Sequence, residues 1–344
     1  MNTKLIEEIA NAVLYEGYML YPYRPSSVKN RQRWNFGVVY PRNYSEAQQG
    51  TDPWFTRTEC LVNGSAQTGI TVRVRFLQAI SRTGRDLQTP LSNTVASSEP
   101  ELQAAPAWQE AAERDAIVEA PSLDQLLSSP LTQLLDLPAS EATESIYDAD
   151  GRVTRLIVRT QESITGRITL SASRLKEDLY KIALEVANEG SVADPGTASR
   201  DCALMRSLLS AHSILSVERG EFVSLLDTPE ELKEFAAQCK NVGSWPVLAG
   251  EQDQRYVMLS SPIILYDYPQ IAPESAGNLF DGTEIDEILA LRILTLTEAE
   301  KREMRDSDER ARQILERTES LPEEQFLKLH GVLRGMRPAL EDQQ

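Results

Sequence analysis

Three runs of the sequence alternate apolar with polar residues, and this pattern constrains the fold more than any other feature. The runs cover residues 70–76, 164–172 and 180–186. A period of two, rich in β-branched residues, predicts strands with one buried and one solvated face. Antiparallel sheets can leave one face in water, so we expect the core to be an antiparallel sheet, either a sandwich or a strongly bent sheet.

Other segments carry weaker strand and turn signals. Asp148-Ala149-Asp150-Gly151 predicts a hairpin turn between residues 145–147 and 153–158. The same residues suggest a calcium loop, but an EF-hand needs a Glu six residues after its Gly, where this chain has Ile157. A hairpin turn is therefore the prediction. Further strands are expected at residues 36–40, 59–62, 246–248, 256–259 and 263–266.

Helical patterns flank the strand-rich part of the chain. Apolar residues recur at helical spacing in residues 3–16 and 201–211, and Thr228 and Thr297 each begin a capping box. Residues 281–340 read as helical throughout. The sequence therefore predicts an α+β fold, with an antiparallel β-sheet or sandwich core, an N-terminal helix and a helical C-terminal region.

Charge divides the chain into unequal parts. Residues 1–98, with the first helix and strands and a basic aromatic surface, hold eleven basic and seven acidic residues. Residues 99–150 hold twelve acidic residues and one basic residue. We expect residues 99–145 to be an acidic, partly disordered insertion and residues 146–280 to complete the β core with interspersed helices. The insertion is a solvated linker, a segment docked on the chain's own basic face, or a partner-binding segment.

The overall charge argues against two classes of partner. A net charge of −17 and a pI near 4.7 disfavour binding to nucleic acid or to an anionic membrane surface. No run approaches the roughly 18 apolar residues that span a bilayer, and the first residues lack a secretory pattern. Three widely spaced cysteines predict free thiols in a reducing compartment, so we expect a cytoplasmic protein without membrane insertion.

Motifs of familiar catalytic sites are missing from the sequence. The chain has no phosphate loop, no dinucleotide-binding glycine pattern and no nucleophile elbow. Its two histidines, His212 and His330, have no second ligand at zinc-site spacing, so we interpret them as polar contacts. Cys60, Cys202 and Cys239 occupy apolar periodic positions and are expected to be small buried residues. No catalytic residue and no cofactor are expected.

One cluster near the N-terminus combines aromatic and basic side chains. Such residues are enriched where the energy of protein–protein binding concentrates, so we interpret the cluster as a partner-binding surface. Two alternatives are a compact basic loop neutralised by the acidic stretch and, less compatible with the charge, a strand-binding site for nucleic acid. The predicted partner-binding residues are Tyr21, Tyr23, Arg24, Lys29, Arg31, Arg33 and Trp34.

A second cluster gathers carboxylates between residues 267 and 287. Four of them, Asp267, Glu274, Asp281 and Glu284, could surround a hard cation or supply an acid–base pair. Acidic residues are also common in the first turn of a helix, where the helix dipole stabilises them without any function. We therefore expect no metal site here and keep a carboxylate site as the alternative.

Four long segments carry a resemblance to a known family. They are residues 15–24 (YEGYMLYPYR), 28–37 (VKNRQRWNFG), 259–269 (LSSPIILYDYP) and 282–292 (GTEIDEILALR). Together they resemble a family of uncharacterised bacterial proteins encoded beside nickel–iron hydrogenase genes. The resemblance covers both ends of the chain, skips the acidic stretch and supplies no catalytic residues. It implies an accessory or maturation role by association.

These observations lead to one hypothesis and one alternative. The hypothesis is a non-catalytic accessory or maturation protein that binds a hydrogenase subunit or its precursor through the aromatic and basic cluster. The alternative is a metal-dependent hydrolase or metal-binding enzyme that uses the carboxylates of residues 267–287.

Overall fold

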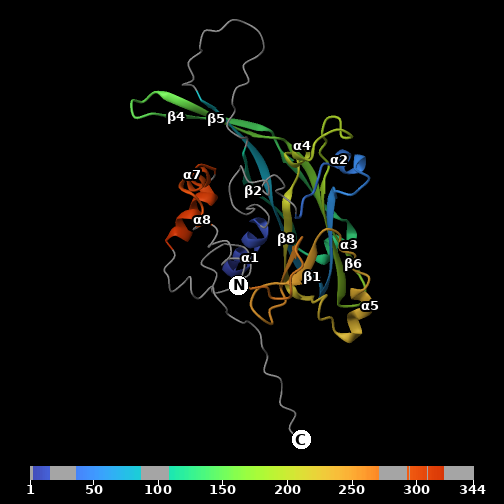
Figure 1. Ribbon diagram of the computed structural model, residues 1–344. Coiled ribbons are helices and arrows are strands. Elements are labelled where there is room, and N and C mark those ends of the chain that lie inside the picture. Colours follow the sequence, from blue (N-terminus) through green and yellow to red (C-terminus); the bar gives the residue numbers. More distant parts are fainter. Residues whose placement is uncertain are drawn as a thin grey trace. The chain divides into compact units, whose positions relative to one another are not determined.

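The computed structural model describes residues 3–15, 36–86, 108–270, 293, 295–307 and 309–320. The chain divides into two units, one of residues 1–18 and 32–269 and the other of residues 19–31 and 270–344. All strands of the described part belong to the first unit, and two helices of the second unit are described (Figure 1). This division differs from the four consecutive segments that the sequence suggests.

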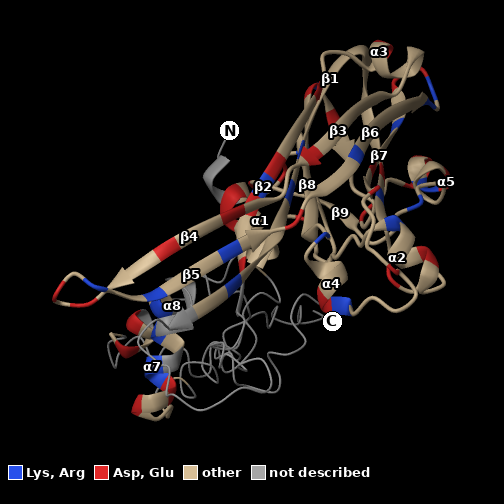
Figure 2. Cartoon of the chain, turned by 90° about the horizontal axis from the view of Figure 1, so that it is seen from above, with Lys and Arg blue, Asp and Glu red and all other residues tan. Residues whose placement is uncertain are grey.

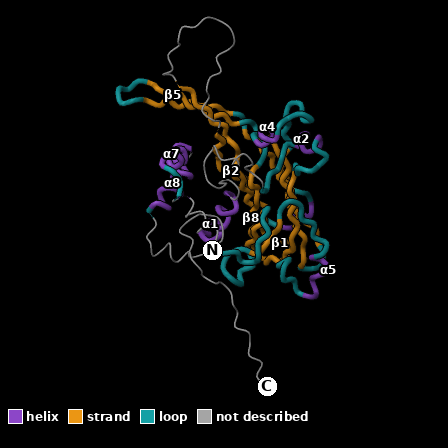
Figure 3. Tube along the Cα trace, in the orientation of Figure 1, coloured by secondary structure: helices purple, strands orange, loops and turns teal. Residues whose placement is uncertain are grey.

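The first unit is built on one very long strand. β1 runs from Phe55 to Asp86, through 32 residues. Its first part pairs with β7 (Leu179–Asn188), its middle with β8 (Leu209–Val223) and β2 (Trp108–Ala120), and its last residues with β5 (Val153–Gln161). All four pairings are antiparallel, so β1 holds the sheet together (Figure 3).

A contact that depends on a glycine lets β1 continue between residues 59–62 and 70–76, which were expected to be separate strands. Between Gly64 and Gly69 the register with β8 shifts, and the Thr68 hydroxyl donates to the backbone carbonyl of Arg219 at 2.7 Å. A Cβ atom on Gly220 would lie 2.8 Å from Cγ2 of Thr68. The missing side chain at Gly220 therefore leaves room for Thr68, and the strand continues instead of ending.

The sheet has ten strands in the order β3-β6-β7-β1-β8-β10-β9, with β2, β4 and β5 attached beside this path. Every strand pairing within it is antiparallel. The antiparallel sheet and the α+β class predicted from the sequence are confirmed. The remaining strands are β3 (Leu131–Leu137), β4 (Ser140–Tyr147), β6 (Ile164–Arg174), β9 (Trp245–Leu248) and β10 (Val257–Ser261).

The main core collects the apolar face of these strands. Val72, Val74 and Phe76 of β1 pack there with Ile168 of β6 and Ile182 of β7, all at most 1% exposed. The short helix α3 (Leu123–Ser128) adds two more buried leucines and begins at Ser122, whose side chain accepts from the Gln125 N–H. Burying such side chains contributes about 2 kcal/mol each, which makes this face the main source of stability.

Residues 108–145 correct the prediction of a partly disordered insertion. From Trp108 onward they form β2, α3, β3 and most of β4, and β2 pairs with the middle of β1. The prediction failed because the acidic residues alternate with small apolar ones that point into the core, such as Ala116 and Val118. Their carboxylates face arginines of β1, which agrees with the interpretation of an acidic segment docked on the chain's own basic face. Residues 99–107 lie outside the described residues.

Several local predictions also need correction. Residues 36–40 form no strand but a single bridge between Val39 and Leu208, and residues 263–266 form a loop. The helix expected over residues 201–211 is only α4 (Arg200–Leu204), because Leu209 starts β8 and pairs with β1. The turn after Asp148 is confirmed: one carboxylate oxygen accepts from the backbone N–H groups of Asp150 and Arg152.

The first unit also contains one longer helix and several short helical elements. α1 (Thr3–Tyr15) matches the predicted N-terminal helix and buries Ile9, Val13 and Leu14. Three short elements, α2 (Arg42–Ala47), η2 (Glu230–Leu232) and α5 (Lys233–Ala236), lie in loops of the first unit. No helix of the described residues is long and apolar enough to cross a membrane.

In the second unit, α7 (Glu298–Ser307) and α8 (Glu309–Glu319) pack together. The capping box at Thr297 is present, since its hydroxyl accepts from the Glu300 N–H and its own N–H donates to the Glu300 carboxylate. Lys301 and Arg305 both bind Glu319 at 2.9 Å. Most of the predicted helical region 281–340 lies outside the described residues.

Candidate functional site

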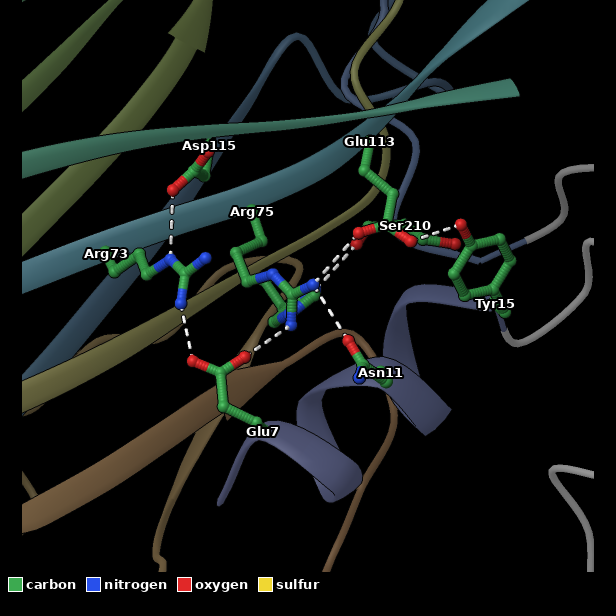
Figure 4. Close-up of polar contacts among 9 residues, drawn as sticks. Glu7, Asn11, Tyr15, Arg73, Arg75, Glu113, Asp115 and Ser210 are labelled. Carbon is green, nitrogen blue, oxygen red and sulfur yellow. Dashed lines mark hydrogen bonds and ion pairs between the residues drawn. The ribbon is translucent and has the colours of Figure 1, made fainter. Parts of the chain in front are cut away.

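A network of charged side chains joins α1 to the polar face of β1 (Figure 4). Arg75 points from β1 toward the helix and is 6% exposed. Its guanidinium donates to the Asn11 side-chain oxygen at 2.8 Å and pairs with the carboxylates of Glu7 at 3.4 Å and Glu113 at 3.3 Å. Glu113 also accepts from the Tyr15 hydroxyl. Residues 7, 11 and 15 are spaced four apart, so α1 presents them along one side.

Arg73 extends the same network at its more exposed end. Its guanidinium pairs with Glu7 at 2.5 Å and with Asp115 of β2 at 3.0 Å. Glu7 therefore bridges two arginines of alternate positions on β1. Each arginine binds an acceptor on α1 and another on β2, so the network holds these two elements against β1.

His212 lies directly across from Arg75, where β8 pairs with β1. The imidazole is 2% exposed and its Nδ1 lies 3.0 Å from the Ser210 carbonyl oxygen. Because a carbonyl only accepts, Nδ1 carries the proton, and Nε2 keeps a lone pair that has no hydrogen-bond partner among the described residues. Burial lowers the pKa of His212 to about 4, so the ring is neutral at pH 7.

The backbone beside His212 is irregular. Ser210 has a positive φ of 50°, and the register of β1 with β8 shifts between Arg75 and Leu77. Bulges of this kind re-aim side chains and recur beside functional sites. Here the irregularity places a neutral imidazole next to a buried guanidinium, under the helix. A ring so deeply buried cannot reach a substrate in solution, so the arrangement is a structural one.

A second buried charge lies on the strand pair β1 and β7. The Glu59 side chain is 3% exposed and pairs with Arg57 at 2.7 Å and Lys181 at 3.4 Å. Burial raises the pKa of its carboxyl, but the hydrogen bond from the Lys240 N–H and the two cations outweigh this effect, so the pKa lies below its usual value. The carboxylate is thus charged and fully engaged, and it fixes the loop around Asn241, whose side chain accepts from the Glu59 N–H.

The loop of residues 262–268 after β10 presents large apolar side chains from a fixed backbone. Asp267 anchors it: one carboxylate oxygen accepts from the Leu248 N–H at 2.8 Å and the other from the Ser224 hydroxyl at 2.5 Å. The Tyr268 N–H donates to the Leu248 carbonyl at 2.7 Å. Ile264 and Tyr266 nevertheless point to solvent, 75% and 86% exposed.

A neighbouring turn adds a third exposed residue. Ser224, which binds Asp267, also accepts from the N–H groups of Leu226 and Asp227, and Leu226 is 57% exposed. We call Leu226, Ile264 and Tyr266 the apolar loop surface. Exposed apolar residues are common singly, but these three stand on two turns that one hydroxyl–carboxylate bond joins, so the backbone beneath them is fixed before any partner binds.

The residues predicted from the sequence are only partly covered by the structure. The aromatic and basic cluster, Tyr21, Tyr23, Arg24, Lys29, Arg31, Arg33 and Trp34, lies outside the described residues. Of the alternative carboxylate site, Asp267 is described and its oxygens hold the loop, whereas Glu274, Asp281 and Glu284 lie outside. Within the described part, no group of three or more His, Cys, Asp and Glu residues is arranged to hold a metal ion.

The three cysteines are free, as expected, but differ in exposure. Cys60 is buried, Cys239 is intermediate and Cys202 is exposed, so the prediction of three buried residues was wrong for Cys202. Burial raises the pKa of Cys60, and raises that of Cys239 to about 11. Both of these thiols are therefore protonated and unreactive at neutral pH.

Comparison with known proteins adds no assignment. No protein-family model matches the chain, and no curated protein matches it. The residues and their geometry, together with the resemblance carried by the sequence, are therefore the basis for a function.

Proposed function

We propose that this chain is a non-catalytic accessory or maturation protein that binds another protein, with a nickel–iron hydrogenase subunit or its precursor as the partner. The observation that carries the proposal is the apolar loop surface, where Ile264 and Tyr266 stand in solvent on a loop anchored through Asp267. The choice of hydrogenase comes from the resemblance alone, and a cytoplasmic location belongs to the same proposal.

Binding of a partner has a free-energy cost that the apolar loop surface lowers. A partner must desolvate and immobilise the side chains that it contacts, and a surface that is already fixed lowers this cost. Tyrosine is enriched among residues that dominate binding energy, and Tyr266 presents both a ring and a hydroxyl. The backbone hydrogen bonds around Asp267 fix where that ring begins. Ile264 and Tyr266 lie in the segment 259–269, which also carries the resemblance.

Binding of purified hydrogenase subunits from the same organism tests the proposal. We expect the double variant Ile264→Ser with Tyr266→Ser to bind the subunit or its precursor at least tenfold more weakly than wild type. Leu134→Ser is the matched control, because Leu134 is 73% exposed on β3, away from the loop. Equal affinity of the double variant and wild type would count against this surface.

The aromatic and basic cluster is a second surface in the same proposal. Co-purification of Arg31→Glu with Arg33→Glu against wild type tests it independently, and loss of the subunit is the expected result. If neither pair of substitutions changes recovery of the subunit, hydrogenase is not the partner. Elemental analysis of wild type and Glu284→Gln checks the alternative carboxylate site, since a bound divalent ion that is lost in the variant would favour an enzyme.

A further inference from the structure

The outer edge of β4 pairs with no strand of the described residues. β4 pairs with β5 over eight residues, and the hairpin of the two strands projects from the sheet of the first unit (Figure 1). Every residue of β4 except Ser145 is exposed. An edge of this kind presents a row of unpaired backbone N–H and C=O groups that another strand can use.

Over most of its length, β4 has only one of the usual protections of an edge strand, the charged side chains of Glu141 and Glu144. Natural edges are kept short, carry charged residues or proline, contain a bulge, or lie under a loop or helix. β4 is longer than an average strand and has neither proline nor lysine between Ser140 and Tyr147. Its only irregularity is a register shift between Ile146 and Tyr147, at the end next to the turn. Residues 140–145 are therefore regular and accessible.

The charges of the hairpin are separated between its strands. The edge strand carries Glu141 and Glu144, and the turn adds Asp148 and Asp150, whereas the arginines of the hairpin are on the other side of the turn (Figure 2). Arg159 binds Glu144 at 2.7 Å. Glu141 has no ion pair among the described residues and is exposed. An incoming strand thus meets an acidic edge.

The charge pattern indicates which kind of strand can bind at the edge of β4. A second copy would bring one acidic edge against another, and each chain carries a net charge of −17, so self-pairing is opposed by repulsion. A segment with Lys or Arg opposite Glu141 gains attraction in the same geometry. We propose that the edge of β4 binds an extended, Lys- or Arg-rich segment of a partner protein, which adds to the hairpin as a further strand.

The edge of β4 is a different surface from the one proposed to bind a hydrogenase subunit, so either can bind a partner without the other. Backbone hydrogen bonds supply most of the affinity in strand addition, and side chains at alternate positions supply selectivity. We therefore expect any extended segment with basic residues at alternate positions to bind, and an acidic segment of equal length not to bind.

Binding of a synthetic peptide is the first test. The probe is a capped ten-residue peptide of alternating Lys and Val with a fluorescent label, and the comparison peptide has Glu in place of Lys. We expect fluorescence anisotropy to show saturable binding of the Lys peptide alone. Glu141→Lys should weaken it about tenfold, and Glu177→Lys, the same charge change in the exposed turn after β6, should leave it nearly unchanged. Absence of binding to wild type would overturn the proposal.

Hydrogen exchange separates strand addition from simple charge attraction. On binding of the Lys peptide, amides of residues 140–147 should gain protection while those of β10 stay unchanged. Saturable binding without protection in residues 140–147 would overturn the proposal, because the peptide would then bind elsewhere. Sedimentation of the chain alone checks the other occupant: a dimer with protected β4 amides would show that a second copy takes the edge.

Discussion

Arg75 and Arg159 each bind two carboxylates, yet they lie in opposite environments. Arg75 is 6% exposed beneath α1, and it binds Glu7 and Glu113 along with the Asn11 side chain. Arg159 is 32% exposed on the hairpin and binds Glu110 and Glu144 at 2.8 and 2.7 Å. The hairpin has the shorter ion pairs. Loss of a partner nevertheless costs more at Arg75, because water reaches its buried guanidinium poorly.

The comparison shows that distance alone does not rank ion pairs. On the hairpin, the hydrogen bond from Arg159 lowers the pKa of Glu144, and the carboxylates raise the pKa of Arg159, but solvent replaces a lost partner. Under α1, by contrast, loss of the acceptors would leave the charged guanidinium of Arg75 buried without a partner. The first network therefore fixes α1 to the sheet, whereas the second lies on the solvated surface of the hairpin and contributes little to its stability.

The largest expected effect comes from Arg75→Met. The substitution keeps much of the side chain's volume but removes the charge that Glu7 and Glu113 share. We expect the free energy of unfolding to fall by about 3–4 kcal/mol, the lower part of the range for a broken buried pair, because both carboxylates are about half-exposed. Urea denaturation measures it. A loss no larger than that of Arg159→Met would break the comparison.

The next effect is a pH dependence carried by His212. Its pKa of about 4 in the folded chain lies below the ordinary value of 6.5, so the unfolded state takes up a proton first as the pH falls. The contribution is complete above pH 6.5 and is lost as the pH falls toward 4, by up to about 3 kcal/mol. His212→Asn should flatten this part of the stability curve. Parallel curves for the variant and wild type would show that His212 does not titrate as inferred.

A smaller effect is expected for Glu59→Gln. The variant leaves Lys181 and Arg57 without a carboxylate but keeps an acceptor for the Lys240 N–H. We expect a loss of about 2 kcal/mol at pH 7. The pKa of Glu59 is lowered in the folded state, so its contribution exists above the unfolded value and is lost as the pH falls through the folded one. Variant and wild type should therefore converge in stability as the carboxyl becomes protonated in acid, below the folded pKa, and a constant difference would exclude a charged Glu59.

The smallest effect is expected for Arg159→Met. Both partners are reached by water to some extent, and exposed pairs contribute little. A change of about 0.5–1 kcal/mol, which shrinks further when salt is raised from 0.05 to about 0.5 M, is the expected result. Chemical denaturation at the two salt concentrations measures it. A large loss of unfolding free energy that does not depend on salt would show that Arg159 behaves like the buried Arg75 and would contradict the comparison.

The sequence predicted those parts of the fold where a local pattern and the tertiary structure agree. Alternation located β6 and β7 to within two residues, because each buries one face in the same core. The spacing of Met205, Leu208 and Leu209 suits a helix equally well, and no local signal announces the positive φ of Ser210 that starts β8 against β1. These residues form a strand because β8 pairs with β1, which is distant in the sequence.

The candidate surfaces were harder to predict than the fold. Asp267 was recognised as a carboxylate that could work with its neighbours in sequence, yet its partner Ser224 is 43 residues away. His212 was noted as a lone histidine, but its position across from Arg75 follows only from strand register. The arginines of β1 were expected on the solvated face of the strand, but α1 covers that face and Arg75 is buried. Their acceptors come from α1 and from β2, which lies in the segment expected to be an acidic insertion.

The length of β1 has a consequence for synthesis of the chain. β1 is complete at Asp86, but its last partner, β8, ends at Val223. At about 5–20 residues per second, the ribosome leaves this strand incompletely paired for roughly ten seconds or more. During that time the part of β1 that pairs with β8 has no partner on that edge, although β2, β5 and β7 are already made. Slower translation after residue 86 is therefore expected to lower the yield of soluble protein.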